Sequence, residues 1–145
     1  MWRLYANTGL RRAEGIVLRR AWIGREEMKI LSTEEHRTKS GLWRHIPLSE
    51  GAKMALAELP PQAQLILPQM TLPSLSRAFV HDAERAGLDG SLHTLRHTYI
   101  SHLVRAGVAL RTVQVYAGHA RFSTTEKYAY LQPGVAPSQV KNLAL

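Results

Sequence analysis

The chain has 145 residues and a mass of 16.3 kDa, which suits one domain with its own hydrophobic core. It contains no cysteine, which excludes disulfide frameworks, thiolate zinc sites and cysteine nucleophiles. A formal net charge of +8 indicates an anionic partner, and nucleic acid is the first candidate because neutralised phosphates release counterions. No apolar run is long enough to span a bilayer and the N-terminus lacks the apolar core of a secretory signal, so we expect a soluble, cytoplasmic protein.

The first half of the chain predicts a short helix and a hairpin. The helix begins near Arg11, after the Thr-Gly turn at residues 8–9. Two strands follow over residues 28–31 and 42–48, and the polar residues between them predict a hairpin loop with Lys39 and Ser40 at its tip.

The second half predicts helices separated by proline and glycine. Ser49 is a suitable N-cap for a helix that the prolines at 60–61 must stop, and a proline-punctuated connection runs over residues 62–73. Apolar spacing and terminal glycines then predict three helices, over residues 74–86, 93–106 and about 111–116.

The last predicted helix opens with a Ser-x-x-Glu capping box formed by Ser123 and Glu126, which places Tyr128 in its first turns and Tyr130 on another face. The predicted fold class is α+β and mainly α, a helical domain with a small antiparallel β-sheet in its N-terminal part. Residues 134–145 form a tail spaced by proline and glycine, for which docking on a neighbouring protomer is a hypothesis.

Several motifs gather cationic and phenolic side chains. His93 and Arg96 are three residues apart on one helix face, so both can contact one phosphate. With four other positions they resemble the catalytic domain of the tyrosine recombinases, the phage integrase family of DNA strand-exchange enzymes. Each motif alone arises by chance, but six in the family's order form a specific set. The matching positions are Arg11 in Thr-Gly-Leu-Arg, Lys39 in Thr-Lys-Ser-Gly, His93, Arg96, His119 in Ala-Gly-His and Tyr128 in Thr-Thr-Glu-Lys-Tyr.

The resemblance implies a catalytic mechanism that begins with attack of Tyr128 on a DNA phosphate. A covalent 3'-phosphotyrosine forms and the 5'-hydroxyl of the DNA leaves. Arg11 and Arg96 would stabilise the transition state, because a guanidinium offers a planar fork of donors to the nonbridging oxygens.

The remaining matched positions have supporting roles by the same resemblance. Lys39 is the expected general acid, His93 assists proton transfer at the nucleophile, and His119 donates a hydrogen bond to the phosphate. Glu14, three residues after Arg11, is expected to orient neighbouring cations. No metal or other cofactor is required, because the cationic side chains supply the positive field.

Other interpretations of the same residues stay open. His97 is rotated about a hundred degrees from Arg96 around the helix, which favours a structural or supporting role. Residues 111–131 could form a helix-turn-helix-like DNA-binding module without catalytic activity. A type IB topoisomerase-like enzyme, which relaxes DNA, would share the chemistry.

The resemblance covers residues 1–145 as one catalytic domain, without the N-terminal DNA-clamping domain that family members usually carry. Double-stranded DNA is the expected partner, with possible assembly to a tetramer on that DNA. Without the clamp we expect weak, salt-sensitive binding.

Overall fold

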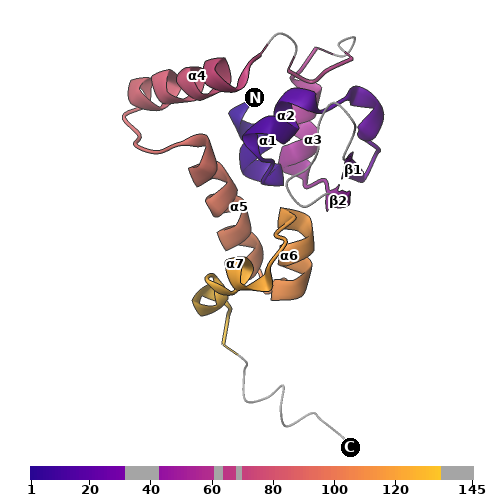
Figure 1. The fold of residues 1–145 in the computed structure, drawn as a ribbon, viewed down its shortest axis with the longest axis vertical. Coiled ribbons are helices and arrows are strands. Elements are labelled where there is room, and N and C mark those ends of the chain that lie inside the picture. Colours follow the sequence, from indigo (N-terminus) through magenta and orange to yellow (C-terminus); the bar gives the residue numbers. More distant parts are fainter. Residues whose placement is uncertain (32–42, 61–63, 68–69, 135–145) are drawn as a thin grey trace, which may run out of the picture.

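The computed structural model describes residues 1–31, 43–60, 64–67 and 70–134 (Figure 1). These residues are mainly helical with one two-stranded antiparallel sheet, which confirms the predicted fold class. None of the described helices is long and apolar enough to cross a membrane. The elements in chain order are α1 (Trp2–Thr8), α2 (Arg12–Val17), η1 (Arg20–Trp22), β1 (Glu27–Ile30), β2 (Arg44–Pro47), α3 (Glu50–Ala57), α4 (Leu72–Arg85), α5 (Leu92–Arg105), α6 (Leu110–Ala117), α7 (Phe122–Glu126) and η2 (Ala129–Leu131).

Helix α1 was not predicted from the sequence, and it is central to the packing of the domain. It packs on both α3 and α5, and its residues Leu4 and Tyr5 are fully buried. The helix ends at Gly9, which has a φ of 61°. A Cβ atom at this position would lie 2.3 Å from the ring of Tyr99, so only glycine allows this close approach. The turn at Gly9 leads the chain directly to Arg11.

Strands β1 and β2 form the predicted antiparallel pair, with Met28 opposite Ile46. Both side chains are completely buried, and exposed or partly exposed residues alternate with them along each strand. This period of two is that of a sheet with one face in the core. The predicted hairpin tip, with Lys39 and Ser40, lies outside the described residues.

Helices α3 and α4 begin at polar caps. Ser49 caps α3 as predicted, and the helix ends before the two prolines. Helix α4 begins at Leu72, two residues before the predicted start at Ser74. The reason is that the side chain of Thr71 caps the helix, while Pro73 falls in the first turn, where its missing N–H is not needed.

Helices α5 and α6 lie within one residue of their predicted bounds at each end. Glycines with positive φ follow both helices, 81° at Gly107 and 65° at Gly118. Tyr99, Ile100 and Val104 of α5 are buried in the core as predicted. Figure 1 shows α5 extending from the region of α1 and α3 to α6 and α7, so this helix connects the N-terminal helices with the C-terminal ones.

Helix α7 corrects the prediction of a capping box at Ser123 and Glu126. Arg121 is the last extended residue before the helix, so Ser123 already lies inside it and caps nothing. The helix ends at Glu126, and the chain tightens into η2, where the Tyr128 N–H donates to the carbonyl of Thr125 at 2.9 Å. Tyr128 therefore lies just beyond the helix rather than in its first turns.

Candidate active site

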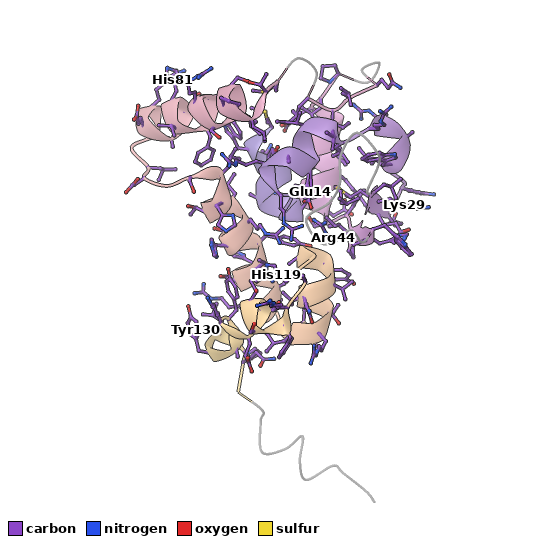
Figure 2. All side chains as sticks on the ribbon, viewed as in Figure 1. Glu14, Lys29, Arg44, His81, His119 and Tyr130 are labelled. Carbon is purple, nitrogen blue, oxygen red and sulfur yellow. The ribbon has the colours of Figure 1, made fainter. Side chains whose placement is uncertain are left out.

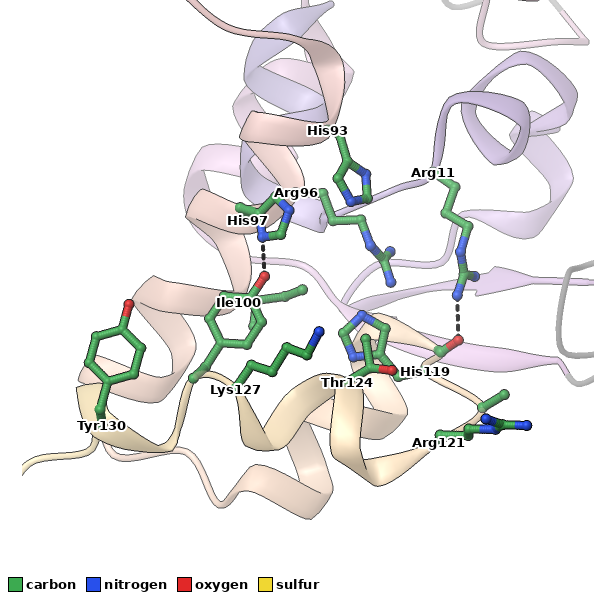
Figure 3. Close-up of a pocket in the computed structure, with 13 residues that line it drawn as sticks. Arg11, His93, Arg96, His97, Ile100, His119, Arg121, Thr124, Lys127 and Tyr130 are labelled. Atoms are coloured by element: carbon green, nitrogen blue, oxygen red, sulfur yellow. Dashed lines mark hydrogen bonds between the residues drawn. The ribbon is translucent and has the colours of Figure 1, made fainter.

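An open cavity of about 600 Å³ lies where the turn after α1 faces α5, the loop between α6 and α7, and the segment after α7 (Figure 3). Five of the six predicted catalytic positions line it, although they come from opposite ends of the sequence: Arg11, His93, Arg96, His119 and Tyr128. The sixth, Lys39, lies outside the described residues.

Arg11 is held at the cavity by Glu14. The backbone N–H of Arg11 donates to the Glu14 carboxylate at 2.7 Å, and its guanidinium donates to the other carboxylate oxygen at 2.8 Å. Two further bonds of 2.8 Å join Glu14 to Arg44 of β2 (Figure 2). Burial alone would raise the pKa of Glu14, but the hydrogen bonds and charges of Arg44 and Arg11 lower it to about 2. Glu14 is therefore ionised at neutral pH and fixes Arg11 in place.

Arg96 is buried beneath the cavity, with only 3% of its surface exposed. Its guanidinium donates to the carbonyl oxygens of Gly9 and Ala117, which belong to the turn after α1 and to the end of α6. Burial, and then the nearby charge of Arg11, lowers the pKa of Arg96 to about 10. The group remains charged at neutral pH, in a fixed orientation.

Three guanidinium groups converge on the C-terminal end of α6. The final carbonyls of a helix have no partner within it and carry partial negative charge, so cations are stabilised there. A Cβ atom at Gly118 would lie 2.9 Å from the Arg44 guanidinium, which explains the glycine at this point. The guanidinium groups donate to consecutive carbonyls in the pairs Arg44–Tyr116, Arg96–Ala117 and Arg11–Gly118.

His119 follows this helix end directly. Its Nδ1 lies 2.8 Å from the hydroxyl of Thr125, a fully buried residue of α7, and this contact fixes the plane of the imidazole. Burial is the first cause that lowers the pKa of His119, to about 4, and the charges of Arg96 and Arg11 add to it. The imidazole is therefore neutral near pH 7.

Tyr128, in the segment after α7, also lines the cavity. Its hydroxyl forms a hydrogen bond with Nδ1 of His97 on α5 (Figure 3). Burial raises the pKa of Tyr128, and the charge of Arg96 offsets this only in part, so the phenol keeps its proton at neutral pH. Tyr130 lines the same cavity, but 81% of its surface is exposed.

His97, for which the sequence favours a structural or supporting role, lines the cavity and forms a hydrogen bond with the phenol. Although His97 is offset from Arg96 around α5, both residues line the cavity, because the cavity extends along the surface of this helix. Its ring also meets that of His93 edge to face, with 4.6 Å between centroids. His93 and His97 are four residues apart and so share a helix face, a signal present in the sequence.

Two further residues of the site were missed. Arg44 precedes Ile46 by two positions in strand β2, so both side chains point to the buried face of the sheet. An arginine on a buried face indicates a buried hydrogen-bonding or acidic partner. Lys127 lines the cavity beside Tyr128. Among the described residues, no group of three side chains is placed to hold a metal ion.

The arrangement combines two immobilised guanidinium groups, a neutral imidazole and a protonated phenol. Guanidinium forks bind the nonbridging oxygens of a phosphate, and a phenol becomes a nucleophile when a neighbouring base removes its proton. The cavity therefore has the components that phosphoryl transfer to a tyrosine requires.

Comparison with known sequences extends this result. The sequence profile of the phage integrase family matches residues 1–134. Tyrosine recombinase XerD of Shewanella oneidensis is 31% identical over 150 aligned positions, which cover 88% of this chain and 47% of that protein. XerD of Pseudomonas putida is 42% identical over 65 positions, which cover 43% of this chain and 22% of that protein. The chain thus spans less than half the length of these relatives.

Solved structures have the same fold. The catalytic domain of bacteriophage HP1 integrase superposes with a TM-score of 0.73 and 25% identity, covering 97% of this chain and 79% of that one. The Tn1549 transposon integrase in complex with a circular intermediate DNA gives a TM-score of 0.76 and 18% identity, covering 97% and 55%. Since the family profile covers nearly the whole sequence and the fold agrees, the chain belongs to the phage integrase family.

Proposed function

We propose that the chain is the strand-cleaving domain of a site-specific DNA recombinase or integrase, and that it cuts and rejoins DNA through a covalent 3'-phosphotyrosine. The observation that supports this most is the convergence of Arg11, Arg96, His119 and Tyr128 on one cavity. The family supports it too, since the solved relatives include XerH recombinase bound to its difH substrate. The net charge of +8 suits a DNA-binding surface.

In the proposed reaction the scissile phosphate enters the cavity with its nonbridging oxygens against Arg11 and Arg96. The Tyr128 oxygen loses its proton and attacks phosphorus, while the bond from phosphorus to the 5'-oxygen breaks. Because both guanidinium groups are already tied to backbone carbonyls, they need little rearrangement as charge develops.

Four other side chains complete the proposal. Lys39 supplies a proton to the leaving 5'-oxygen, and His119 donates a hydrogen bond to the phosphate. Glu14 fixes the orientation of Arg11 through the contacts described above. His93 assists proton movement at the nucleophile, and its ring contacts that of His97, which is hydrogen-bonded to the phenol.

Double-stranded DNA is the proposed substrate, and assembly of four copies on DNA is the proposed form for strand exchange. The 145 residues act as the catalytic domain in this proposal. Integration or excision of a mobile element is the proposed setting.

Covalent capture tests the function without knowledge of the target sequence. The full chain is incubated at low salt with a pool of duplexes that have randomised arms and a nick just 3' of the candidate cleavage position. Cleavage releases a short strand that diffuses away, so the phosphotyrosine adduct accumulates. We expect adducts that survive denaturant, are recovered by phenol extraction, and yield an enriched sequence.

Tyr128→Phe is the decisive variant, because it removes the nucleophilic oxygen and keeps the ring. It is expected to form no adduct, whereas the matched control Tyr116→Phe, whose side chain does not line the cavity, is expected to form as much as wild type. Sequence-specific binding without any adduct would instead indicate the helix-turn-helix-like module. An adduct that relaxes supercoiled plasmid without exchanging strands would indicate the topoisomerase-like enzyme.

A further inference from the structure

We infer that His97 is the base that takes the proton from Tyr128 during cleavage and returns it during rejoining. This inference rests on the proposed function, and it assigns the proton to a residue that the sequence motif does not single out. It follows from the contact between the two side chains rather than from the spacing of His93 and Arg96.

The geometry places only one imidazole directly on the phenol hydroxyl among the described residues. Nδ1 of His97 forms a hydrogen bond with the Tyr128 oxygen, and the two rings lie 5.8 Å apart between centroids. The ring of His93 instead contacts that of His97 edge to face, and His119 is bonded to Thr125.

The phenol can donate a hydrogen bond and an imidazole nitrogen can accept it. Burial raises the pKa of Tyr128, so its hydroxyl holds its proton at neutral pH and is the donor towards Nδ1 of His97 in this inference. A carbonyl or amide oxygen at this place could accept the hydrogen bond but could not remove the proton. Imidazole can do both, because its ordinary pKa lies near the working pH.

A proton transfer accompanies each bond change at phosphorus. The phenol proton passes to Nδ1 of His97 as the phenol oxygen bonds to phosphorus, and the bond from phosphorus to the 5'-oxygen breaks with that oxygen taking a proton from the general acid. Rejoining reverses the step, because the 5'-hydroxyl attacks phosphorus and the His97 imidazolium returns its proton to the departing phenol oxygen.

Other titratable groups surround His97 in the cavity. On its own helix its ring contacts that of His93, and Arg96 lines the same cavity. The titratable groups that share the cavity from other segments are Arg11, His119, Arg121, Lys127, Tyr128 and Tyr130. The arginines and the lysine among them make the cavity positively charged, which suits an anionic phosphate.

Two substitutions at His97 separate proton transfer from positioning. His97→Asn keeps an acceptor atom near the place of Nδ1 but cannot take the proton, and His97→Phe keeps the ring shape alone. His97 is exposed, so neither change removes buried core. Single-turnover adduct formation is measured on the duplex recovered by covalent capture. We expect both variants to be slower than wild type by about 100-fold or more.

A second substrate gives a readout that a structural role would not change. A strand ending in a 3'-(4-nitrophenyl) phosphate mimics the phosphotyrosine intermediate, but its leaving group is stable as an anion and needs no proton. Joining of this strand to a 5'-hydroxyl is measured in a Tyr128→Phe background, so that the hydroxyl attacks the nitrophenyl phosphate directly and 4-nitrophenolate leaves. Adding either His97 substitution is expected to keep the rate within about threefold of that of Tyr128→Phe alone, because no step then uses His97. His102→Asn, at an exposed histidine of α5 outside the cavity, is the matched control and is expected to retain both rates.

The possible outcomes are distinct. If wild type forms no adduct on any duplex, the proposed function fails. If wild type forms the adduct and His97→Asn forms it at the same rate, the function stands and the assignment of His97 as base is wrong. If His97→Asn slows both the cleavage and the bypass reaction equally, His97 only maintains the cavity and the assignment is again wrong.

Discussion

Glu14 and Arg44 form a two-pronged ion pair in which both N–O distances are 2.8 Å and neither side chain exposes more than 4% of its surface. Neither residue lines the cavity, yet Glu14 also binds Arg11, which does. The pair therefore connects strand β2 and helix α2 to the cations that face the proposed substrate.

Removal of one partner of this pair is expected to destabilise the fold. Arg44→Met leaves the carboxylate of Glu14 buried with only Arg11 as counter-ion, and we expect a loss of about 3 kcal/mol in the free energy of unfolding. Urea denaturation followed by circular dichroism measures it.

The double variant Arg44→Met with Glu14→Met tests the cause, because it replaces both charges by apolar side chains. It is expected to recover most of the lost stability, since no unpaired charge remains. Arg3→Met, which breaks the exposed pair with Glu58, is the control and is expected to change stability little. Wild-type stability in Arg44→Met would contradict this account of the pair.

Substitution of Arg11 by lysine is expected to affect catalysis more than folding. Lysine keeps the charge but lacks the fork that contacts both Glu14 and the carbonyl of Gly118. We expect adduct formation to slow about 100-fold to 1000-fold. The neighbouring exposed residue offers a matched control, Arg12→Lys, which is expected to keep the wild-type rate. An Arg11→Lys enzyme as fast as wild type would remove Arg11 from the mechanism.

His119 makes the stability of the protein depend on pH. Its pKa is about 4 in the folded state, against an ordinary value of 6.5, so between these values the unfolded chain binds more protons. The free energy of unfolding therefore falls as the pH is lowered through this window. Thermal unfolding at about pH 7.5 and pH 5 is expected to show a smaller decrease in Tm for His119→Asn than for wild type.

Two other groups define the limits of that experiment. Burial first, and then the charges of His97 and Arg96, also lower the pKa of His93, so some decrease in Tm remains in the variant. Glu14 acts at lower pH, because its stabilising contribution is complete above about 4.5 and is lost as the pH falls towards 2. An equal decrease in Tm for both proteins would contradict the assignment to His119.

Gly15 in α2 is expected to tolerate no side chain. An added Cβ atom would lie 2.0 Å from the hydroxyl oxygen of Tyr5, which is fully buried and cannot move aside freely. We expect Gly15→Ala to lower the free energy of unfolding by about 1–3 kcal/mol through overpacking. Gly134→Ala, where no described residue lies within 4 Å of the added atom, is the control and is expected to be neutral. A neutral Gly15→Ala would show that Tyr5 packs differently.

The parts of the fold that follow from local rules were predictable. Helix α5 has a regular apolar stripe and a terminal glycine, and its bounds were correct to within one residue. Helix α1 was missed because its seven residues have no polar cap bond and are stabilised by packing on α3 and α5, which no local pattern reveals. The bounds of α7 were wrong for the same reason, because tertiary contacts rather than the capping motif determine where this helix begins and ends.

The motif residues of the candidate site were predictable because their order and chemistry resemble a family, whereas their connections were not. Nothing near Arg44 in the sequence indicates a partner 30 residues away, although its place on the inner face of a strand is a clue. The place of His97 in the cavity could not be predicted, because an angle measured around one helix does not give the extent of the cavity beside it. The contact of His97 with Tyr128 depends on where the chain turns after α7, which only the fold determines.

The end of α6 receives guanidinium groups from β2, from α5 and from the turn after α1, so the cation cluster has no local precursor. A nascent chain of about one hundred residues contains Arg11 and Arg96. It does not yet contain the end of α6 that orders them, or Tyr128. Under the proposed function, a partly synthesised copy therefore lacks the groups that cleave DNA, and the active site forms only after Tyr128 has been added.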